Sequence, residues 1–497
     1  MVTIPSFSKQ SKDHLAILMY PSLKTRTYEE LESNSIKYAN YLNSLNLQSG
    51  SHIAIYADNC IEFLEMCWAA QRSGIIYTCI PYHLSEDEAE YIIFNCGARL
   101  VAYSDKTAKI INKLKDKDKY SSINFLQLEN SINSIKSKVS SEVCFEEIEG
   151  SDMLYSSGTT GKPKGIKLNF AKHKFGTSPY LVELIKKEYD FSSQTIYLSP
   201  APLYHAAPLR FCMAVHRLGG TVICMEKFYA EESLKVIDTF KVTHSQWVPT
   251  MLHRIISLPE NTKSKYNCNS LKAIIHAAAP CPVELKIKLI KWFGNIIYEY
   301  YASTEGAGFC AINSEQWLKK IGSVGKAIKG KIKICSIDNP DKEIDIGKVG
   351  LIFFSEGENF EYHNDLDKTK KSKNNKDWVT VGDIGYLDED GYLYLTDRSN
   401  NVIISGGVNI YPQEIENLLS SHDYVFDVAV VAKKDIEFGE LPHAIVVKKT
   451  NISEKKIIED LIEYCKKNIS SVKCPKSWEF RESLPREDNG KLYKNKL

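Results

Sequence analysis

Segments with strand and helix patterns alternate along much of this chain. Apolar residues recur with helical spacing from Leu31 to Leu45, and a short strand pattern follows at Ile53–Ala57. EFLEMCWAAQRSG is then predicted to be a helix that ends at Gly74, and ARLVAYSD to be a buried strand. Further on, GTVICM and LKAIIHAAAP have strand character on either side of a helical SLKVIDTF. This alternation predicts an α/β fold with parallel sheets covered by helices.

Length and pattern together predict more than one domain. The chain has 497 residues, whereas one core usually supports roughly 250–300. From about Arg398 the pattern changes to short strands, VFDVAVVAKKD and HAIVVKK, and a helix in SEKKIIEDLIEYCKKNIS with Ser453 as its N-cap. The apolar face of that helix is expected to contain Ile458, Leu461, Ile462 and Cys465. We place the boundary near Asp397, which predicts domains of 1–397 and 398–497.

Composition excludes several classes of protein. The formal net charge is +1, so no general attraction to nucleic acid is expected. No signal peptide is apparent, and no run approaches the roughly 18 apolar residues of a membrane span. The thirteen cysteines include no CxxC pair, which indicates reduced thiols and a cytoplasmic protein. The lysine-rich stretch Asp367–Asp377 is expected to be an exposed, mobile loop, and the sequence leaves a homodimer open.

The segment YSSGTTGKPKG, Tyr155–Gly165, has the composition of an anion-binding loop. Glycines let the backbone approach a bulky anion, and hydroxyl and backbone N–H groups donate to phosphate oxygens. Gly, Ser and Pro also mark a flexible hairpin. The spacing differs from the P-loop pattern GxxxxGK[ST], which disfavours an ordinary P-loop ATPase.

This segment resembles the phosphate loop of the superfamily that contains AMP-forming acyl-CoA synthetases, luciferases and peptide-synthetase adenylation domains. The resemblance implies ATP or AMP binding by Ser156, Ser157, Gly158, Thr159, Thr160, Gly161 and Lys164. It also implies a large N-terminal domain of parallel and mixed sheets with a β-barrel-like subdomain, and a small, mobile C-terminal α+β domain.

A second segment, EYYASTEG, resembles the aromatic-Gly-x-Thr-Glu motif of the same superfamily. An aromatic ring can stack on adenine, a hydroxyl can bind the α-phosphate and a carboxylate can hold Mg²⁺. The resemblance gives these roles to Tyr301, Thr304 and Glu305, and places Glu299 and Tyr300 in the nucleotide site. Taken alone, the segment also fits a strand and turn with a buried tyrosine pair. Ala302 stands where Gly is usual, which is expected to tighten the adenine pocket.

The longest resemblance runs from Thr380 to Glu416. It implies that Asp383 and Arg398 bind the ribose and that Asp397 is the hinge between the domains. Gly406 and Gly407 match glycines along the path of the CoA thiol. Near the terminus, LPREDNGKLYKNKL resembles the motif whose lysine, Lys491 in this sequence, contacts the carboxylate and α-phosphate during adenylation. Asn400 and Asn401 replace the usual Lys-Asp pair, so no charge role is expected at those positions.

The implied reaction activates a carboxylic acid with ATP and Mg²⁺ as an acyl-adenylate and transfers the acyl group to CoA. The acyl pocket is expected to involve His205, Trp247, Ala278, Ala302 and Gly306, and Ala277, Ala278 and Ala279 are expected to lie along adenine and the acyl group. His205 and Trp247 also fit ordinary core positions. The segment APLYHAAPL lacks the Asp that holds an amino acid's ammonium group. We expect a medium- or long-chain fatty acid; a bile-acid, sterol or aryl acid, loading of a carrier protein, and a silent binding protein remain alternatives.

Overall fold

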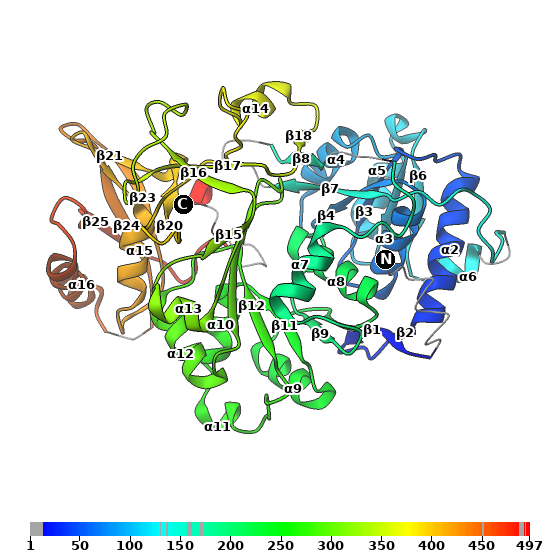
Figure 1. The fold of residues 1–497 in the computed structure, drawn as a ribbon, viewed down its shortest axis with the longest axis horizontal. Coiled ribbons are helices and arrows are strands. Elements are labelled where there is room, and N and C mark those ends of the chain that lie inside the picture. Colours follow the sequence, from blue (N-terminus) through cyan, green and yellow to red (C-terminus); the bar gives the residue numbers. More distant parts are fainter. Residues whose placement is uncertain are drawn as a thin grey trace. The chain divides into compact units, whose positions relative to one another are not determined.

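The computed structural model describes residues 13–129, 131–135, 138–156, 162–168, 172–449, 452–486, 492 and 494–497. The chain divides into two compact units, both of which contain sheets and helices (Figure 1). The first unit comprises residues 1–247, 258–275 and 358–369, and the second comprises 248–257, 276–357 and 370–497. The predicted domains 1–397 and 398–497 are defined by a rotation about Asp397. These two domains stay a prediction.

The first unit contains a seven-stranded sheet in the order β18-β8-β7-β4-β3-β5-β6. Neighbours from β7 to β6 pair in parallel, whereas β8 pairs antiparallel with both β7 and β18. The strands are β3 (His52–Tyr56), β4 (Ile76–Ile80), β5 (Leu100–Tyr103), β6 (Asn124–Gln127), β7 (Ser151–Ser156), β8 (Lys164–Leu168) and β18 (Phe360–Tyr362).

A second group of strands in the first unit has the order β12-β11-β9-β10-β1-β2. Strand β9 pairs in parallel with β10 and β11, and β10 with β1, so the predicted parallel sheets are confirmed. The strands are β1 (Leu15–Tyr20), β2 (Thr25–Thr27), β9 (Ile196–Ser199), β10 (Thr221–Met225), β11 (His244–Trp247) and β12 (Ala273–His276).

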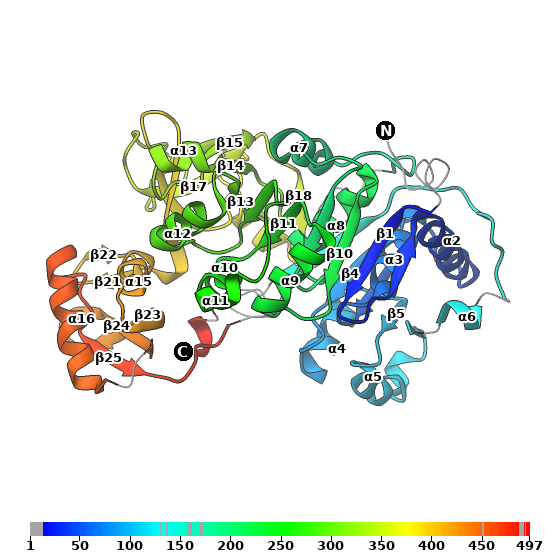
Figure 2. The same ribbon diagram turned by 90° about the horizontal axis from the view of Figure 1, so that it is seen from below.

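Helices cover the sheets of the first unit. They are α2 (Tyr28–Ser44), α3 (Ile61–Arg72), α4 (Glu86–Asn95), α5 (Ala108–Lys115), α6 (Ser131–Ile135), α7 (Tyr180–Tyr189), α8 (Ala206–Leu218), α9 (Ala230–Phe240) and α11 (Glu260–Lys263). Thr27 and Ser85 begin α2 and α4 with capping boxes, which satisfy backbone N–H groups of the first turn. Helix α3 packs against both β1 and β4, and eleven of its twelve residues are buried, including the polar Glu65, Gln71 and Arg72 (Figure 2).

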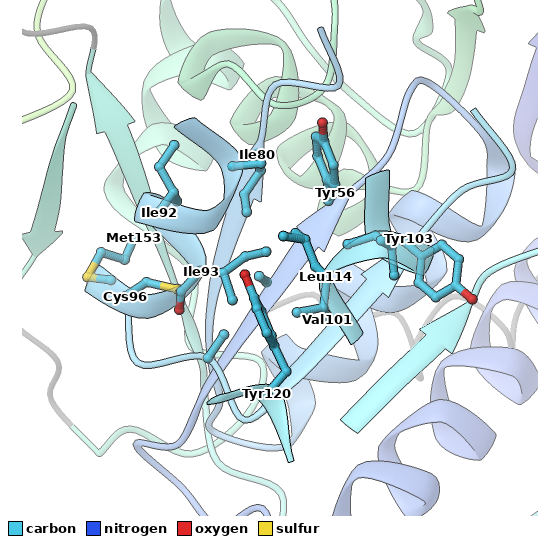
Figure 3. Close-up of a cluster of buried hydrophobic side chains, with 14 of the residues drawn as sticks. Tyr56, Ile80, Ile92, Ile93, Cys96, Val101, Tyr103, Leu114, Tyr120 and Met153 are labelled. Carbon is cyan, nitrogen blue, oxygen red and sulfur yellow. The ribbon is translucent and has the colours of Figure 1, made fainter. Parts of the chain in front are cut away.

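A hydrophobic core lies on one face of the seven-stranded sheet (Figure 3). Side chains from β3, β4, β5 and β7 meet those of α4 and α5 in this core. Its labelled members are Tyr56, Ile80, Ile92, Ile93, Cys96, Val101, Tyr103, Leu114, Tyr120 and Met153. The core fixes the strand β7, which leads directly into the predicted phosphate loop.

The second unit begins with short elements around the EYYASTEG segment. The strands β13 (Ile297–Ala302), β14 (Phe309–Asn313) and β15 (Lys326–Lys329) form an antiparallel ladder, and the helices are α10 (Pro249–Ile256), α12 (Val283–Phe293) and α13 (Ser314–Lys319). The β-barrel-like subdomain that the resemblance implies corresponds to a four-stranded antiparallel sheet. Its strands are β16 (Lys331–Cys335), β17 (Gly350–Ser355), β19 (Asp383–Leu387) and β20 (Leu393–Arg398).

The C-terminal part of the second unit is a small α+β module. Strands β21 (Ile403–Ser405), β22 (Val408–Ile410), β23 (Val425–Asp435), β24 (Gly439–Lys448) and β25 (Ser477–Phe480) form one sheet. Helices α15 (Pro412–Ser420) and α16 (Glu454–Asn468) share a hydrophobic core with this sheet (Figure 2). The fold class predicted from the sequence is therefore confirmed: α/β with mixed sheets and a small C-terminal domain.

Two local predictions are wrong. The predicted loop Asp367–Asp377 is wrong in its first part, because residues up to Lys371 belong to the helix α14 (Leu366–Lys371), whereas 372–377 form no helix. The main-chain N–H of Lys368 donates to Asp365 Oδ1 at 2.9 Å. That acceptor supplies the helix start that the lysine-rich composition concealed. On α16 the buried face is Ile457, Leu461 and Cys465, because these three lie four residues apart, whereas Ile458 and Ile462 are half-buried. Ser453 is the N-cap residue, but its side chain makes no capping hydrogen bond.

All thirteen cysteines lie in the described part of the chain and are free thiols. Within the same residues, no helix combines the length and the apolar character needed to cross a membrane.

Candidate active site

The predicted phosphate loop connects two antiparallel strands. Ser156 ends β7 opposite Lys164, which begins β8, so the loop joins the strands as a hairpin. Ser157, Gly158, Thr159, Thr160 and Gly161 lie outside the described residues. The Lys164 ammonium is 2.6 Å from Asp365 Oδ2, and this contact lowers the pKa of Asp365. The structure therefore places a carboxylate beside the loop lysine, which the sequence reasoning had not identified.

Polar contacts hold the segment that contains His205. The buried Asn59 side chain donates to the carbonyl of Ala201 at 3.2 Å and accepts from the N–H of Leu203 at 2.8 Å. His205 itself is the N-cap residue of α8 and is half-buried, with its ring 4.5 Å from that of Tyr204. The Asn59 side chain thus holds the turn between β9 and α8, although Asn59 lies 144 positions before Leu203 in the sequence.

An ion pair ties the same helix to the strand before the phosphate loop. Arg210 on α8 lies 2.8 Å from Asp152 on β7, and its Nε is 3.2 Å from the same carboxylate oxygen. Trp247, predicted as a pocket wall or a core residue, is only 3% exposed, and its indole N–H donates to Ser245. That burial favours the core interpretation for Trp247.

In the second unit, three predicted site residues from separate segments come together. The Tyr301 hydroxyl donates to Asp383 Oδ2 at 2.6 Å, although the two residues are 82 positions apart. Arg398 Nε is 3.2 Å from the other oxygen, Oδ1. Burial, and next the Asp383 charge, raise the pKa of Tyr301 well above its ordinary value, so the phenol stays a donor. The Arg398 side chain remains 43% exposed, so it can reach a ligand as well.

The EYYASTEG segment passes from strand to turn as the sequence pattern suggests. The Tyr300 ring stacks on Phe309 at 4.8 Å, and Glu305 is buried. Thr304 and Ala302 are half-buried, and Gly306 adopts a φ of +70° after the strand has ended. Gly308 is required by packing, because a Cβ there would lie 2.0 Å from the Phe354 ring.

The alanine turn after β12 has an unusual backbone. Ala278 has a φ of +71°, which is a left-handed conformation that residues other than Gly, Asn and Asp seldom adopt. Ala277 is buried, whereas Ala278 is exposed and Ala279 is half-buried. A strained alanine between two predicted ligand contacts is a feature that composition alone could not reveal.

A buried ion pair lies beneath these two segments. Lys286 on α12 is fully buried, and its ammonium is 2.5 Å from Oε2 of Glu299 on β13. Burial raises the pKa of Glu299 and, together with the nearby Lys286 charge, lowers the pKa of His276 well below its ordinary value. Sequence reasoning missed Lys286, although its position on the face of Leu289 was a signal, because a lysine on an apolar helix face needs a partner.

The predicted hinge residue has a dense set of hydrogen bonds. Asp397 Oδ1 accepts from the main-chain N–H of Arg398 at 2.7 Å and from the Asn401 amide at 3.0 Å. Its Oδ2 accepts from the N–H of Gln413 at the start of α15, at 2.8 Å. Asp397 therefore joins β20 to the first helix of the small module.

Gly406 and Gly407 form the turn of the β21–β22 hairpin. Ser405 pairs with Val408 across the turn, and the two glycines have φ values of +54° and +80°. Two-residue hairpin turns of type I′ require positive φ at both central positions, so both glycines have a backbone reason of their own. Lys491 lies outside the described residues.

Comparison with known proteins identifies the family. Residues 6–361 match the family described as AMP-binding enzyme, and residues 414–491 match the AMP-binding enzyme C-terminal domain. The chain therefore belongs to the AMP-binding enzymes, which are the adenylate-forming superfamily that its motifs resemble.

Named relatives narrow the class of enzyme. The 2-succinylbenzoate–CoA ligase of Oceanobacillus iheyensis is 30% identical over 475 residues, which cover 95% of this chain and 93% of that protein. The long-chain-fatty-acid–CoA ligase FadD13 of Mycobacterium tuberculosis is 29% identical over 486 residues, with 96% and 93% covered. By class, this chain is an AMP-forming acid–CoA ligase.

Solved structures agree with this classification. The o-succinylbenzoate CoA synthetase from Bacillus subtilis, in complex with its acyl-adenylate intermediate, matches with a TM-score of 0.83 and 25% identity over 99% of this chain and 96% of that chain. Another structure of that enzyme, described as a complex with ATP and a magnesium ion, matches with a TM-score of 0.82 and 25% identity over 99% and 98% of the two chains.

Proposed function

We propose that this enzyme activates a medium- or long-chain fatty acid with ATP and transfers the acyl group to CoA. In the first step a carboxylate oxygen attacks the α-phosphorus, the bond to the β-phosphate breaks, and pyrophosphate leaves. In the second step the CoA sulfur attacks the acyl carbon, and AMP leaves with the electron pair of the mixed anhydride bond.

The cluster of Tyr301, Asp383 and Arg398 carries the nucleotide part of this proposal. Asp383 offers two carboxylate oxygens that can accept from the two ribose hydroxyls, and Arg398 can donate to the same sugar. The Tyr301 ring is held in place by the hydrogen bond to Asp383 at 2.6 Å, which leaves its face for stacking on adenine.

Other site residues keep the roles that the resemblance implies. Thr304 would donate to the α-phosphate, and Ser156, Lys164 and the loop 157–161 would hold the leaving pyrophosphate. Glu305 would hold Mg²⁺, which offsets the charge of the phosphates when it is bound. Lys491 would act in adenylation, and Gly406 and Gly407 would line the CoA path after rotation of residues 398–497 about Asp397.

The choice of acid rests on the charges near the predicted acyl segment. Residues 201–209 contain no lysine or arginine, and the next residue, Arg210, is paired with Asp152 at 2.8 Å. A dicarboxylic acid would need a cation for its second carboxylate. The segment therefore favours an apolar monocarboxylic acid, with His205 near its carboxylate.

An aryl acid is the second candidate. The names of several relatives, which are 2-succinylbenzoate–CoA ligases, support it. Bile-acid or sterol side chains, and transfer to a carrier protein instead of CoA, are further outcomes that the same assay detects.

A substrate panel tests the proposal. Pyrophosphate release is measured with octanoate, palmitate, cholate, benzoate and 2-succinylbenzoate, each with and without CoA, and acyl-CoA is identified by mass. We expect a fatty acid to give the highest kcat/KM and a thioester that depends on CoA. A clear preference for 2-succinylbenzoate would overturn the choice of acid, and no pyrophosphate release with any acid would overturn the proposed function.

A further inference from the structure

Lys286 is fully buried, although an apolar side chain at this position is expected to stabilise the fold equally well. Lys286 contacts Glu299 at 2.5 Å, and its ammonium lies 4.8 Å from the centroid of the Trp317 ring. Lysine is almost never fully buried without such partners. Because taking two charges out of water is costly, a buried ion pair seldom stabilises a protein more than apolar side chains of similar size would. The best-attested use of such a pair is to fix the register of the elements that it joins.

The elements that this pair joins lead directly into the proposed nucleotide site. Glu299 stands two residues before Tyr301 on the same strand, and His276 stands directly before the turn Ala277–Ala279. His276 Nε2 is 3.8 Å from the Glu299 carboxylate. The imidazole is fully buried, and neither ring nitrogen has a hydrogen-bond partner among the described residues. The Glu299 carboxylate therefore lies on the strand that carries Tyr301 and also close to His276, where the alanine turn begins. Both the strand and the turn are predicted to contact the nucleotide.

We propose that Lys286 is a positioning residue for the nucleotide: its ammonium holds Glu299, and thereby keeps the strand that carries Tyr301 in register with the alanine turn after His276. The Trp317 ring also attracts the ammonium, which lies 4.8 Å from its centroid. This inference rests on the proposed function, because it assumes that both segments contact ATP. Without Lys286, the buried Glu299 would take up a proton and become a donor, so its contact with His276 would change.

The test separates ATP binding from the rest of the reaction. Lys286→Met keeps an unbranched side chain that is only one atom shorter, and it removes the charge. We expect the KM for ATP to rise at least tenfold, while kcat at saturating ATP and the KM for the carboxylic acid change less than threefold. Lys286→Arg restores a cation and should keep the KM for ATP within threefold of wild type. Lys288→Met, at an exposed position on the same helix, is the matched control and should leave all three constants unchanged.

Each outcome decides a separate question. If the wild-type enzyme releases no pyrophosphate with ATP and any acid, the proposed function fails before a variant is made. If wild type is active and Lys286→Met has the KM for ATP of the Lys288→Met control, the positioning role is wrong. It is also wrong if kcat and both KM values worsen together. Should Lys286→Met not fold, Lys286→Gln keeps a donor for Glu299 without the charge, and the same selective rise in the KM for ATP is expected of it.

Discussion

At the scale of single residues, Asp383 carries the most specific prediction. Both of its oxygens are engaged in the structure, by Tyr301 at 2.6 Å and by Arg398 at 3.2 Å. Each hydrogen bond to a charged acceptor contributes about 1.5–3 kcal/mol, so Asp383→Ala should weaken ATP binding by tenfold or more. Isothermal titration with ATP checks this, with Lys288→Met, at an exposed position outside the proposed nucleotide site, as the control. Unchanged ATP affinity in a folded Asp383→Ala variant would refute the ribose assignment.

Ala278 gives a second prediction at the same scale. Its φ of +71° is strained for alanine and natural for glycine. Ala278→Gly should therefore leave the free energy of unfolding unchanged or raise it. Ala279 lies outside the left-handed region, so Ala279→Gly should lower it by about 0.4–1 kcal/mol through the entropy of the unfolded chain. Urea unfolding of both variants measures the difference, and a larger loss for Ala278→Gly would contradict the backbone conformation.

At the scale of elements, His216 on α8 links stability to pH. Its ring is fully buried, accepts from the Trp68 indole N–H at 3.0 Å and donates to the carbonyl of Ala16 at 3.2 Å. Both nitrogens are used by the neutral ring, and burial lowers the pKa of His216 to about 4. The unfolded histidine takes up a proton near pH 6.5, so the unfolded state binds more protons at pH 5 and stability falls as the pH falls from 6.5 toward 4.

For one such histidine, the free energy of unfolding is expected to fall by roughly 2 kcal/mol when the pH is lowered from 7.5 to 5. His52 and His244 add to the same slope, because burial lowers the pKa of each to about 4. Urea unfolding at both pH values should show the loss in the wild-type protein and a smaller loss in His216→Gln. Equal slopes for the two proteins would show that His216 is not the group that titrates.

The hairpin between β21 and β22 gives a second prediction about an element. Gly407 has a φ of +80°, and a left-handed leucine there would cost about 1–2 kcal/mol. Gly407→Leu should therefore lower the melting temperature, whereas Gly407→Asn should preserve it, because asparagine tolerates this conformation. If Gly407 also lines the CoA path, both variants should lose thioester formation while releasing pyrophosphate in a single turnover. A Gly407→Asn enzyme with normal thioester formation would remove the glycine from that path.

The elements show what the sequence could and could not predict. Periodicity identified α3, β3, β5 and β10, because each is long or apolar enough for its pattern to stand out. It missed α14, whose start depends on one side chain, Asp365, rather than on an apolar face. Motifs predict Tyr301, Asp383 and Arg398 as site residues, but they do not predict that the three side chains contact one another. The pairings of Lys286 with Glu299, and of Lys164 with Asp365, depend on tertiary packing that no local pattern encodes.

Across the whole molecule, we propose that the two half-reactions use different parts of one chain. The family matches cover residues 6–361 and 414–491, and Lys491 lies at the end of the second match. Adenylation joins two anions and needs a cation between them. Thioester formation starts from the adenylate and needs a path for the thiol instead. Rotation of residues 398–497 about Asp397 would supply each arrangement in turn.

The most direct measurement is a pair of single-turnover assays on Lys491→Ala, one that follows pyrophosphate from ATP and acid and one that follows acyl-CoA from supplied acyl-adenylate and CoA. We predict that the variant loses pyrophosphate release by at least 100-fold, about 2.7 kcal/mol of transition-state stabilisation. The variant should still convert the supplied adenylate to acyl-CoA at a rate near that of wild type. A folded Lys491→Ala enzyme that loses both activities equally, or that keeps both, would show that Lys491 does not act in adenylation alone.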